Sequence, residues 1–580
     1  MESLRARASA VKADVQSKTT REGWIMEKQA ITFADEGSWS NKDTDVTPLE
    51  RRTWTSWTVL GYWMSDALSV QSWAGASAII AVGLTWSAYL HTFPRAPSKT
   101  KLADYHLGSR REAVYCLILG TFTITIPLCL NGAAGAELHV PFPVIARSSF
   151  GFYFSRFAVI VRMATALFWH AIQTYSGSTA MTQVIRAIWP SYLDIPNHLP
   201  ASAGITTQQM ISHFIFWIVQ FPILLIPPHK LRWFFVFKTV IVLTAATGTV
   251  IGMTQLAKGT GDIWEQQPTV SGSTRAWLIV SSMSSMTGGW ATMATNVADF
   301  TRYMKTPKGV YWQTLFVPGI CTLLGVYGII GTSSSKVVYG EYIWDPVDLA
   351  SRWTGPGGRA AAFFVGVSWC IAQIGTNLSA NVISCSNDMT SLWPKYISIK
   401  RGVIITTITG GWIMVPWKII SSASSLLSFM GALGVVLAPI AAILAADYWV
   451  VKRRAVDVPG LYKRHGRYDY GNRAGTNWRA AIAMAVGTAP CLPGMAAAVE
   501  PSLDIGGASK IYAMFYMYGF TSTFFVYCVQ NWIWPAKDTL VEHTVLEETI
   551  VVDGVQIIND GVQDAQLRKL ASFEEKTVGV

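Results

Sequence analysis

The chain contains about a dozen long apolar runs, and these restrict its fold more than any other feature. Each run approaches the length of about 20 residues that a helix needs to cross a bilayer. Only 14% of the 580 residues are charged, whereas soluble domains carry about 25% charged residues. The sequence therefore predicts an all-α polytopic membrane protein.

We expect about twelve transmembrane helices, which together form a transporter domain over residues 53–535. A tight basic turn, Pro227-Pro228-His229-Lys230, separates the fourth from the fifth. The expected spans lie near 55–92, 112–134, 157–187, 209–227, 231–256, 276–297, 311–331, 359–386, 402–420, 424–450, 479–499 and 510–534.

The charges between the apolar runs predict the orientation. With an inner N-terminus, Lys and Arg concentrate in the inner loops, which is the usual bias of membrane proteins. This accounts for the net charge of +11 without a nucleic-acid partner. We expect cytoplasmic tails at 1–52 and 536–580, where the chain is polar and has no long apolar run. Such tails are usually mobile, although the strand-like run Thr549–Val552 is suited to docking against an inner loop.

One outer loop contradicts this charge pattern. Residues 94–111 carry five basic residues, Arg95, Lys99, Lys101, Arg110 and Arg111. Two interpretations stay open for about 24 residues near 87–110: a genuine outer loop, or an unspliced intron or other gene-model error.

Three segments place polar or small residues inside expected spans, where a helix is easily interrupted. They are 63–70, which contains Asp66; 281–290, which contains Gly288-Gly289; and 372–381, which contains two Asn, a Gln, a Thr and a Ser. Transporters often bind substrates and ions where helices break at mid-membrane. An ionisable residue inside a span is a functional candidate by default. Close packing of small residues and hydrogen bonds between helices are the alternative interpretations.

Trp169 and Gln173 lie four residues apart and share one face of the third expected span. The indole offers a flat stacking surface, and the amide offers two donors and an acceptor. This pair suits a flat heterocycle with polar edges, such as a nucleobase or a hydantoin. An interfacial Trp beside an interhelical amide is the competing interpretation.

An ordered set of motifs resembles the nucleobase–cation symporter-1 family, particularly its fungal uracil, allantoin and uridine permeases. The resemblance extends from about Asn41 to Pro535. It rests on NKDTDVTPLERRTW (41–54), WMSDALSVQSW (63–73), LNGAAGAELHVPFPVIARSSFG (130–151), FWHAIQTY (168–175), GGW (288–290), GTNLSANVISCSND (375–388) and LAPIAAILAADYWVVKRR (437–454). It implies a leucine-transporter-like fold, with inverted five-helix repeats at about 53–256 and 276–450 and extra helices at 479–534.

The resemblance also implies the residues of a substrate site and an outer gate. A bacterial hydantoin transporter of the family holds its substrate between two Trp and contacts it with a Gln and an Asn. Its first-helix Gln aligns with Ser69, which is shorter. The implied substrate-site residues are Trp169, Gln173, Trp290, Asn381, Ser69 and Gly289, and the implied gate residues are Phe429 and Met430.

A sodium-type cation site is implied as well, but with one ligand missing. Carbonyls of Ser65 and Leu68 align with the family's first-helix ligands, and Ala372, Gly375 and Thr376 align with those of the eighth helix. Gly375 offers no side-chain oxygen where the family site uses a hydroxyl. The fungal branch is proton-driven, so we expect H⁺ to be the coupling ion and nearby Asp66 to be the protonated group.

The sequence therefore predicts a proton-coupled symporter for a nucleobase or related compound, namely uracil, allantoin or uridine, in the plasma membrane. The alternative is a vitamin such as thiamine or nicotinamide riboside, carried by the same mechanism. A non-transporting nutrient sensor is the distant alternative. No enzyme is expected, since no nucleophile–base set or phosphate loop stands at informative spacing. We expect no cofactor and no metal, and the expected partners are the small heterocycle and the lipid bilayer.

Overall fold

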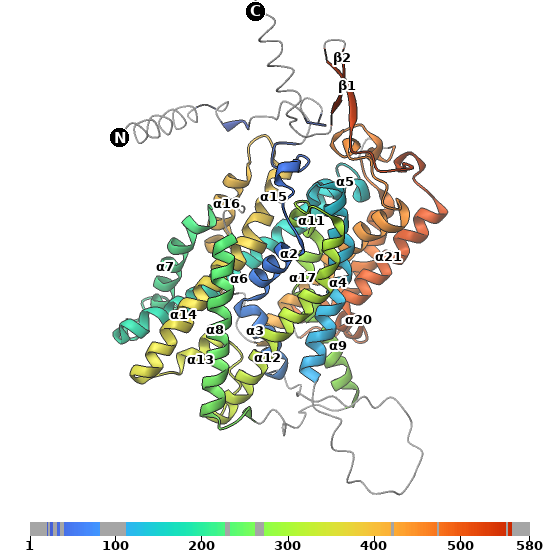
Figure 1. Ribbon diagram of the computed structural model, residues 1–580. Helices are drawn as coiled ribbons and strands as arrows, with labels where there is room; N and C mark the ends of the chain where they lie inside the picture. The colour runs from blue at the N-terminus through green and yellow to red at the C-terminus, as the bar shows by residue number, and fades with distance from the viewer. Residues whose placement is uncertain are drawn as a thin grey trace, which may run out of the picture.

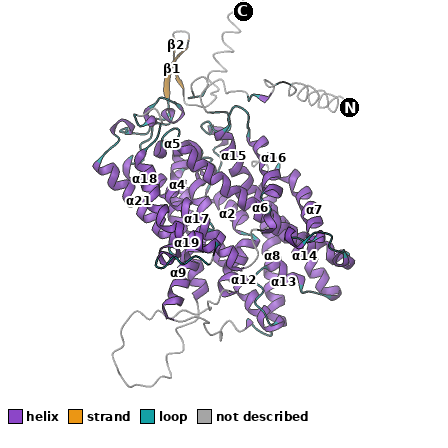
Figure 2. Ribbon diagram, turned by 180° about the vertical axis from the view of Figure 1, so that it is seen from behind, coloured by secondary structure: helices purple, strands orange, loops and turns teal. Residues whose placement is uncertain are grey.

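The computed structural model describes residues 20, 24–26, 32–34, 40–81, 112–226, 232–261, 272–418, 423–471, 475–500, 502–552 and 555–559. The described chain is almost entirely helical, and its only strands form one hairpin (Figures 1 and 2). The basic segment 87–110 lies outside the described residues, so both interpretations of it stay open.

The main helices follow the order of the expected spans. They are α2 (Ser56–Ala67), α3 (Val70–Ala81), α4 (Glu112–Leu138), α5 (Phe142–Phe150), α6 (Ser155–Ile188), α7 (Thr207–Leu224), α8 (Arg232–Leu256), α9 (Gly272–Gly288), α10 (Ala291–Asn296), α11 (Ala298–Thr301), α12 (Gln313–Tyr339), α13 (Pro346–Ser351), α14 (Gly355–Thr376), α15 (Ile383–Leu392), α16 (Ile399–Ile408), α17 (Ala423–Ala446), α18 (Trp478–Thr488), α19 (Leu492–Val499), α20 (Ala508–Ala513) and α21 (Phe515–Ile533).

Short 3₁₀ and π segments extend or connect these helices. The 3₁₀ segments are η2 (Leu49–Arg51), η3 (Pro190–Asp194), η4 (Ala201–Ala203), η7 (Pro307–Trp312), η10 (Pro416–Lys418), η12 (Pro459–Tyr462), η13 (Arg467–Asp469), η14 (Ala489–Cys491) and η15 (Lys537–Thr539). The π segments are η8 (Asn377–Val382), η9 (Thr409–Ile413) and η11 (Asp447–Val451). The hairpin pairs β1 (Glu548–Val552) with β2 (Val555–Asn559) in antiparallel register, Glu548 opposite Asn559.

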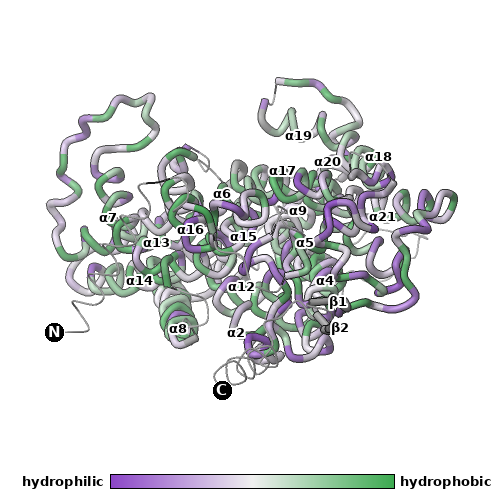
Figure 3. The backbone as a smooth tube through the Cα atoms, turned by 90° about the horizontal axis from the view of Figure 1, so that it is seen from above, coloured by the Kyte–Doolittle hydropathy of each residue, from purple (hydrophilic) through white to green (hydrophobic). Residues whose placement is uncertain are grey.

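Seven helical segments of the described chain are long and apolar enough to cross a membrane, and all seven coincide with expected spans. The other five expected spans fall on shorter or interrupted helices: α2 with α3, α7, α9 with α10, α16 with η9, and α20 with α21. Helix α8 has only 22% of its apolar window buried, and its backbone is predominantly hydrophobic in Figure 3. Such an exposed apolar face is what a bilayer accommodates.

Two of the three predicted interruptions are confirmed. The first expected span is broken at Leu68 and Ser69, where Leu68 has a non-helical ψ of 76° between α2 and α3. The sixth is broken at Gly289 and Trp290, between α9 and α10. The third segment is not broken: the chain continues from α14 through η8 into α15. A π segment widens a helix and displaces its hydrogen bonds, which is frequent at functional sites.

Part of the N-terminal tail is packed, contrary to the expectation of a mobile segment. The Asn41 side chain donates to the carbonyls of Pro394 and Ile397, at 3.1 and 3.0 Å. Arg302 donates to the Asp43 carbonyl at 3.1 Å, and Tyr462 donates to the Thr44 carbonyl at 2.9 Å. We call residues 40–47 the tail segment. It connects the loop before α16 with the loops that follow α11 and α17.

The C-terminal tail also contacts the body of the protein. The Val545 N–H donates to the Val456 carbonyl at 3.0 Å, and the Val458 N–H donates to the Val545 carbonyl at 2.9 Å. The strand-like run at 549–552 lies within β1, as expected. We call the end of the molecule that carries α5 and the hairpin the α5 end; α13 lies toward the opposite end (Figure 1).

Candidate functional site

A cavity lies where the two broken helices meet α6 and η8. All six residues of the expected substrate site line it: Trp169, Gln173, Trp290, Asn381, Ser69 and Gly289. Asp66, Thr376 and Met430, which were expected in the cation site and the outer gate, line it too. The sequence did not single out the remaining lining residues, Gln71, Ser72, Met286, Thr292, Met293 and Ala380.

Aromatic rings hold the two tryptophans in place. Trp290 lies at the break between α9 and α10, and its ring meets that of the fully buried Trp63 edge-on, with centroids 5.7 Å apart. The Trp169 ring meets the ring of Phe429 edge-on at 5.6 Å. Such edge-to-face pairs restrict the orientation of an indole. Phe429 therefore packs against Trp169, and neighbouring Met430 lines the cavity itself.

The polar residues of the cavity are fixed by neighbouring amides. Gln373 donates to the Gln173 side-chain oxygen at 2.5 Å and to the Gln71 side-chain oxygen at 3.1 Å. Asn381 donates to the side-chain oxygen of Asn377 at 3.0 Å. Because a buried polar group is costly when left unpaired, these amides stay in defined orientations.

The expected cation site is filled by a side chain that the sequence analysis overlooked. Lys238 reaches in from α8, and its Nζ donates to the Ser65 carbonyl and, at 2.9 Å, to the Thr376 Oγ1. Thr376 Oγ1 also lies 3.0 Å from the Ala372 carbonyl. Two of the predicted cation ligands, Ser65 and Thr376, thus contact an ammonium group, while Leu68 lies at the helix break itself.

Gly375 is the residue that makes room for this lysine. A Cβ at position 375 would lie 2.4 Å from Lys238 Cδ and 3.0 Å from Nζ. Real Cβ atoms do not approach neighbours at 2.4 Å, so any side chain there would displace the lysine. Gly375 was expected to be a lost ligand; in the structure the Lys238 side chain occupies the space that a side chain at 375 would take.

Asp66 is buried beside this ammonium, with 2% of its surface exposed. Ser379 Oγ donates to Asp66 Oδ1 at 3.4 Å, and Asp66 and Lys238 attract each other electrostatically. Two opposite charges thus share one buried site between α2, α8 and α14. Because an isolated charge is strongly disfavoured in such surroundings, the protonation of either group affects the other.

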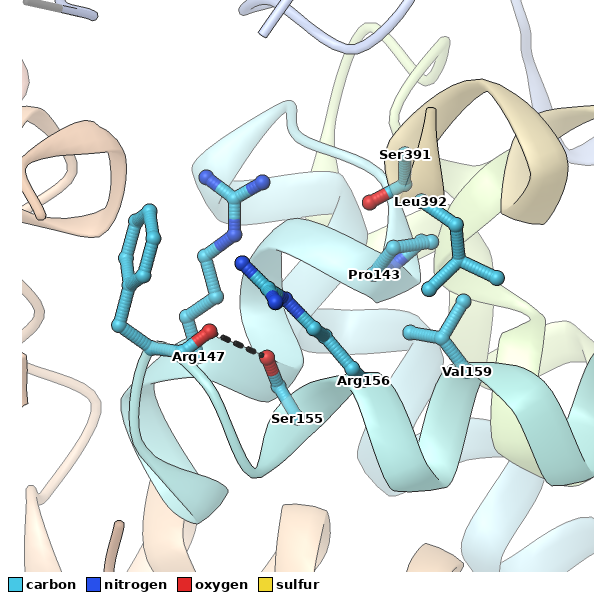
Figure 4. Close-up of a pocket in the computed structure, with 8 residues that line it drawn as sticks. Pro143, Arg147, Ser155, Arg156, Val159, Ser391 and Leu392 are labelled. Carbon is cyan, nitrogen blue, oxygen red and sulfur yellow. Dashed lines mark hydrogen bonds between the residues drawn. The ribbon is translucent and has the colours of Figure 1, made fainter. Parts of the chain in front are cut away.

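A second, smaller cavity lies near the α5 end and contains none of the predicted site residues. The guanidinium groups of Arg147 and Arg156 point into the same space, opposite Ser391 (Figure 4). Ser155 closes one wall by donating to the Phe152 carbonyl at 3.1 Å. This second cavity offers cationic groups without a facing pair of aromatic planes. The central cavity therefore fits a flat neutral heterocycle better than the second cavity does.

Buried charges near the α5 end pair between helices that are far apart in the sequence. In the structure Asp388 forms an ion pair with Arg162 of α6, and both side chains have no exposed surface. Asp299 accepts from the Phe142 N–H at 3.0 Å. Sequence spacing does not point to this pair, because Arg162 is remote from Asp388 in the sequence and lies within an apolar run.

Comparison with known proteins decides the family. Residues 109–523 match the family described as "Permease for cytosine/purines, uracil, thiamine, allantoin". The chain belongs to this family. The permease is 34% identical over 506 residues to an uncharacterized permease of Schizosaccharomyces pombe, covering 87% of this chain and 86% of the relative. It is 30% identical over 522 residues to the uracil permease of Saccharomyces cerevisiae, covering 88% and 78%.

The fold is shared with a solved transporter. The permease superposes on Mhp1, described as a nucleobase-cation-symport-1 family transporter with bromovinylhydantoin bound, with a TM-score of 0.64 at 19% identity. The match covers 87% of this chain and 97% of Mhp1. The predicted leucine-transporter-like fold is confirmed, and the permease is a transport protein rather than an enzyme.

The permease contains two site residues that sequence reasoning missed, Lys238 and Gln373. A signal for Lys238 was present, since it is an ionisable residue inside an expected span, which is a functional candidate by default. Gln373 was noted only as one of the polar residues of the 372–381 segment; its role did not follow from that, because its partners lie on two other helices, α3 and α6. Among the described residues, no group of three or more His, Cys, Asp or Glu is placed to hold a metal ion.

Proposed function

We propose that this permease takes up a flat heterocycle of the uracil or allantoin type together with a proton. The observation that carries the proposal is the central cavity, which gathers two tryptophans and two carboxamides from α6, the α9–α10 break and η8. Stacking on aromatic planes accepts many heterocycles, whereas polar pairing discriminates among them. Trp169 and Trp290 therefore bind the ring, and Gln173 and Asn381 select its edge.

Lys238 supports the proton as coupling ion. Its ammonium donates to a carbonyl on α2 and a hydroxyl on α14, two of the groups that a sodium ion was expected to contact. A protonated lysine thus supplies the positive charge in that site. Loss of the proton would remove this charge and its hydrogen bonds from the gap between the two helices. We assign proton binding to the Asp66–Lys238 pair, rather than to Asp66 alone.

The membrane arrangement follows from the loop charges and the fold. We place the α5 end and both tails in the cytoplasm, with the tail segment closing the cytoplasmic side, and the protein in the plasma membrane. We retain the domain division of 1–52, 53–535 and 536–580, with residues 40–52 of the first part packed on the transporter domain. Helix rocking about the central site then alternates access to it, with Phe429 and Met430 as the outer gate.

The second candidate substrate is thiamine or a related vitamin. It is favoured by two thiamine transporters of Saccharomyces cerevisiae, which are 29% and 28% identical to this chain over 512 residues. A cationic substrate requires an anionic contact, and Asp66 lines the cavity. Since Lys238 already balances Asp66, we rank a neutral heterocycle first.

Radiolabelled uptake in cells that lack their own permeases tests the proposal. Uracil, allantoin, uridine and thiamine are compared, with and without a proton uncoupler and with sodium replaced by potassium. We expect uncoupler-sensitive, sodium-independent uptake of one neutral heterocycle. Sodium-dependent uptake would contradict the role of Lys238. Binding without accumulation would indicate a sensor. A version that lacks residues 87–110 is measured in parallel.

A further inference from the structure

A chain of three glutamines runs beside the central cavity and ends on a backbone amide. The Val70 N–H, which follows the break between α2 and α3, donates to the Gln373 side-chain oxygen at 3.2 Å. Gln373 Nε2 donates to Gln71 and to Gln173, and Gln71 Nε2 donates to Ser176 Oγ at 2.8 Å. Gln373 has no exposed surface, so it cannot exchange these partners for water.

The backbone amide fixes which way every carboxamide in the chain faces. A peptide N–H can only donate, so the oxygen of Gln373 must face Val70 and its NH₂ must face the other two glutamines. Both hydrogens of that NH₂ are then used, one on each partner's oxygen. Gln173 must therefore turn its oxygen toward Gln373, and its own NH₂ is left for the cavity that it lines.

Asn381 is oriented on the opposite side by a network of side chains. Its NH₂ donates to the Asn377 oxygen at 3.0 Å, and the Asn377 NH₂ donates to Gln220 and Thr174, both at 3.2 Å. The Asn381 oxygen is thus the atom left for a ligand. Gln173 presents a donor and Asn381 presents an acceptor.

We propose that Gln373 is a positioning residue that fixes the polarity of the substrate site, so that the ligand must offer a hydrogen-bond acceptor to Gln173 and a donor to Asn381. This inference rests on the proposed function and specifies its substrate class, which is heterocycles with adjacent C=O and N–H groups. It also connects substrate binding to the cation site, because Gln373 lies between Ala372 and Thr376 on α14 and is anchored at the helix break next to Ser69.

The test is a competition assay with two probes of different polarity. Uracil offers adjacent acceptors and donors, whereas the 2-aminoimidazolium ion offers donors only. Each competes with labelled uracil for uptake by the wild-type chain, Gln373→Met and the control Ser176→Ala. Methionine keeps the bulk of glutamine but makes no such bonds, so Gln173 becomes free to present its oxygen.

We expect the ratio of the inhibition constants, 2-aminoimidazolium over uracil, to fall about tenfold or more in Gln373→Met, which is the effect of pairing one previously mismatched group. Ser176→Ala should keep the wild-type ratio, because the Val70 anchor and the Gln373 donors remain. Gln373→Glu, which keeps the acceptor for Val70 but has no NH₂, should shift the ratio in the same direction.

An unchanged ratio in both Gln373 variants would overturn the inference, and so would loss of uracil uptake in both despite normal surface expression, which indicates a structural role. Failure of the wild-type chain to take up uracil would overturn the proposed function, and this inference with it. The wild-type measurement therefore separates the two failures.

Discussion

Gly375→Ala tests the cation site with the smallest possible change. The new Cβ would lie 2.4 Å from Lys238 Cδ, where ordinary contacts begin near 3.4 Å, so the side chain must move by about 1 Å. That movement breaks its bonds to Ser65 and Thr376. Hydrogen bonds to charged groups contribute about 1.5–3 kcal/mol each, so the displacement costs about 3–6 kcal/mol. At 1.36 kcal/mol per tenfold, this is roughly a 10²- to 10⁴-fold loss in occupancy.

The assay is uptake of the transported heterocycle against an imposed pH gradient, at equal surface expression. We expect Gly375→Ala to lose uncoupler-sensitive accumulation while still exchanging substrate down its gradient. Gly248→Ala is the matched control, because Gly248 lies on the same helix as Lys238 and has open space around its Cβ position. Proton-driven accumulation at the wild-type level in Gly375→Ala would refute the requirement for Lys238 in this position.

Three further predictions address the substrate site, the tail segment and the buried ion pair. Trp290→Ala should raise KM about tenfold in uptake assays, because stacking is lost. Trp290→Phe keeps an aromatic ring and should bring KM most of the way back to the wild-type value. Burial raises the pKa of Asp45 to about 6 from 3.8. Docking of the tail segment is therefore favoured below about pH 4 and weakens as the pH rises through 6, by roughly 3 kcal/mol in full. Asp45→Asn should slow hydrogen exchange of residues 40–47 at pH 7 relative to wild type, a difference that should vanish near pH 4. Arg162→Met should lower the Tm of purified protein markedly, since breaking a buried pair costs about 3–5 kcal/mol. The double variant Arg162→Met with Asp388→Leu should recover much of that loss in Tm. Equal Tm values for the single and the double variant would contradict the pairing.

The sequence predicted the helical architecture well because lipid imposes a simple rule on it. Long apolar runs indicate spans, and the seven helices long enough to cross a membrane all lie where expected. Breaks at 68–69 and 289–290 were predictable from small and polar residues within spans, since such residues do not sustain a helix in lipid without a partner. The π segment at Asn377–Val382 was not predictable, because a helix can accommodate polar residues by widening as well as by breaking.

The six residues expected in the substrate site followed from the family resemblance that the ordered motifs carry, and the structure places all of them on one cavity. The sequence by itself thus determined which segments form the spans, which of them are interrupted and which side chains line the central cavity. Only the tertiary structure decided that Lys238 enters the space left by Gly375, and that the Val70 amide orients Gln173 through Gln373. Both depend on side chains from different helices meeting in a buried space, where each polar atom must find a partner. Sequence spacing does not record those distances, because the contacts join residues up to 303 positions apart.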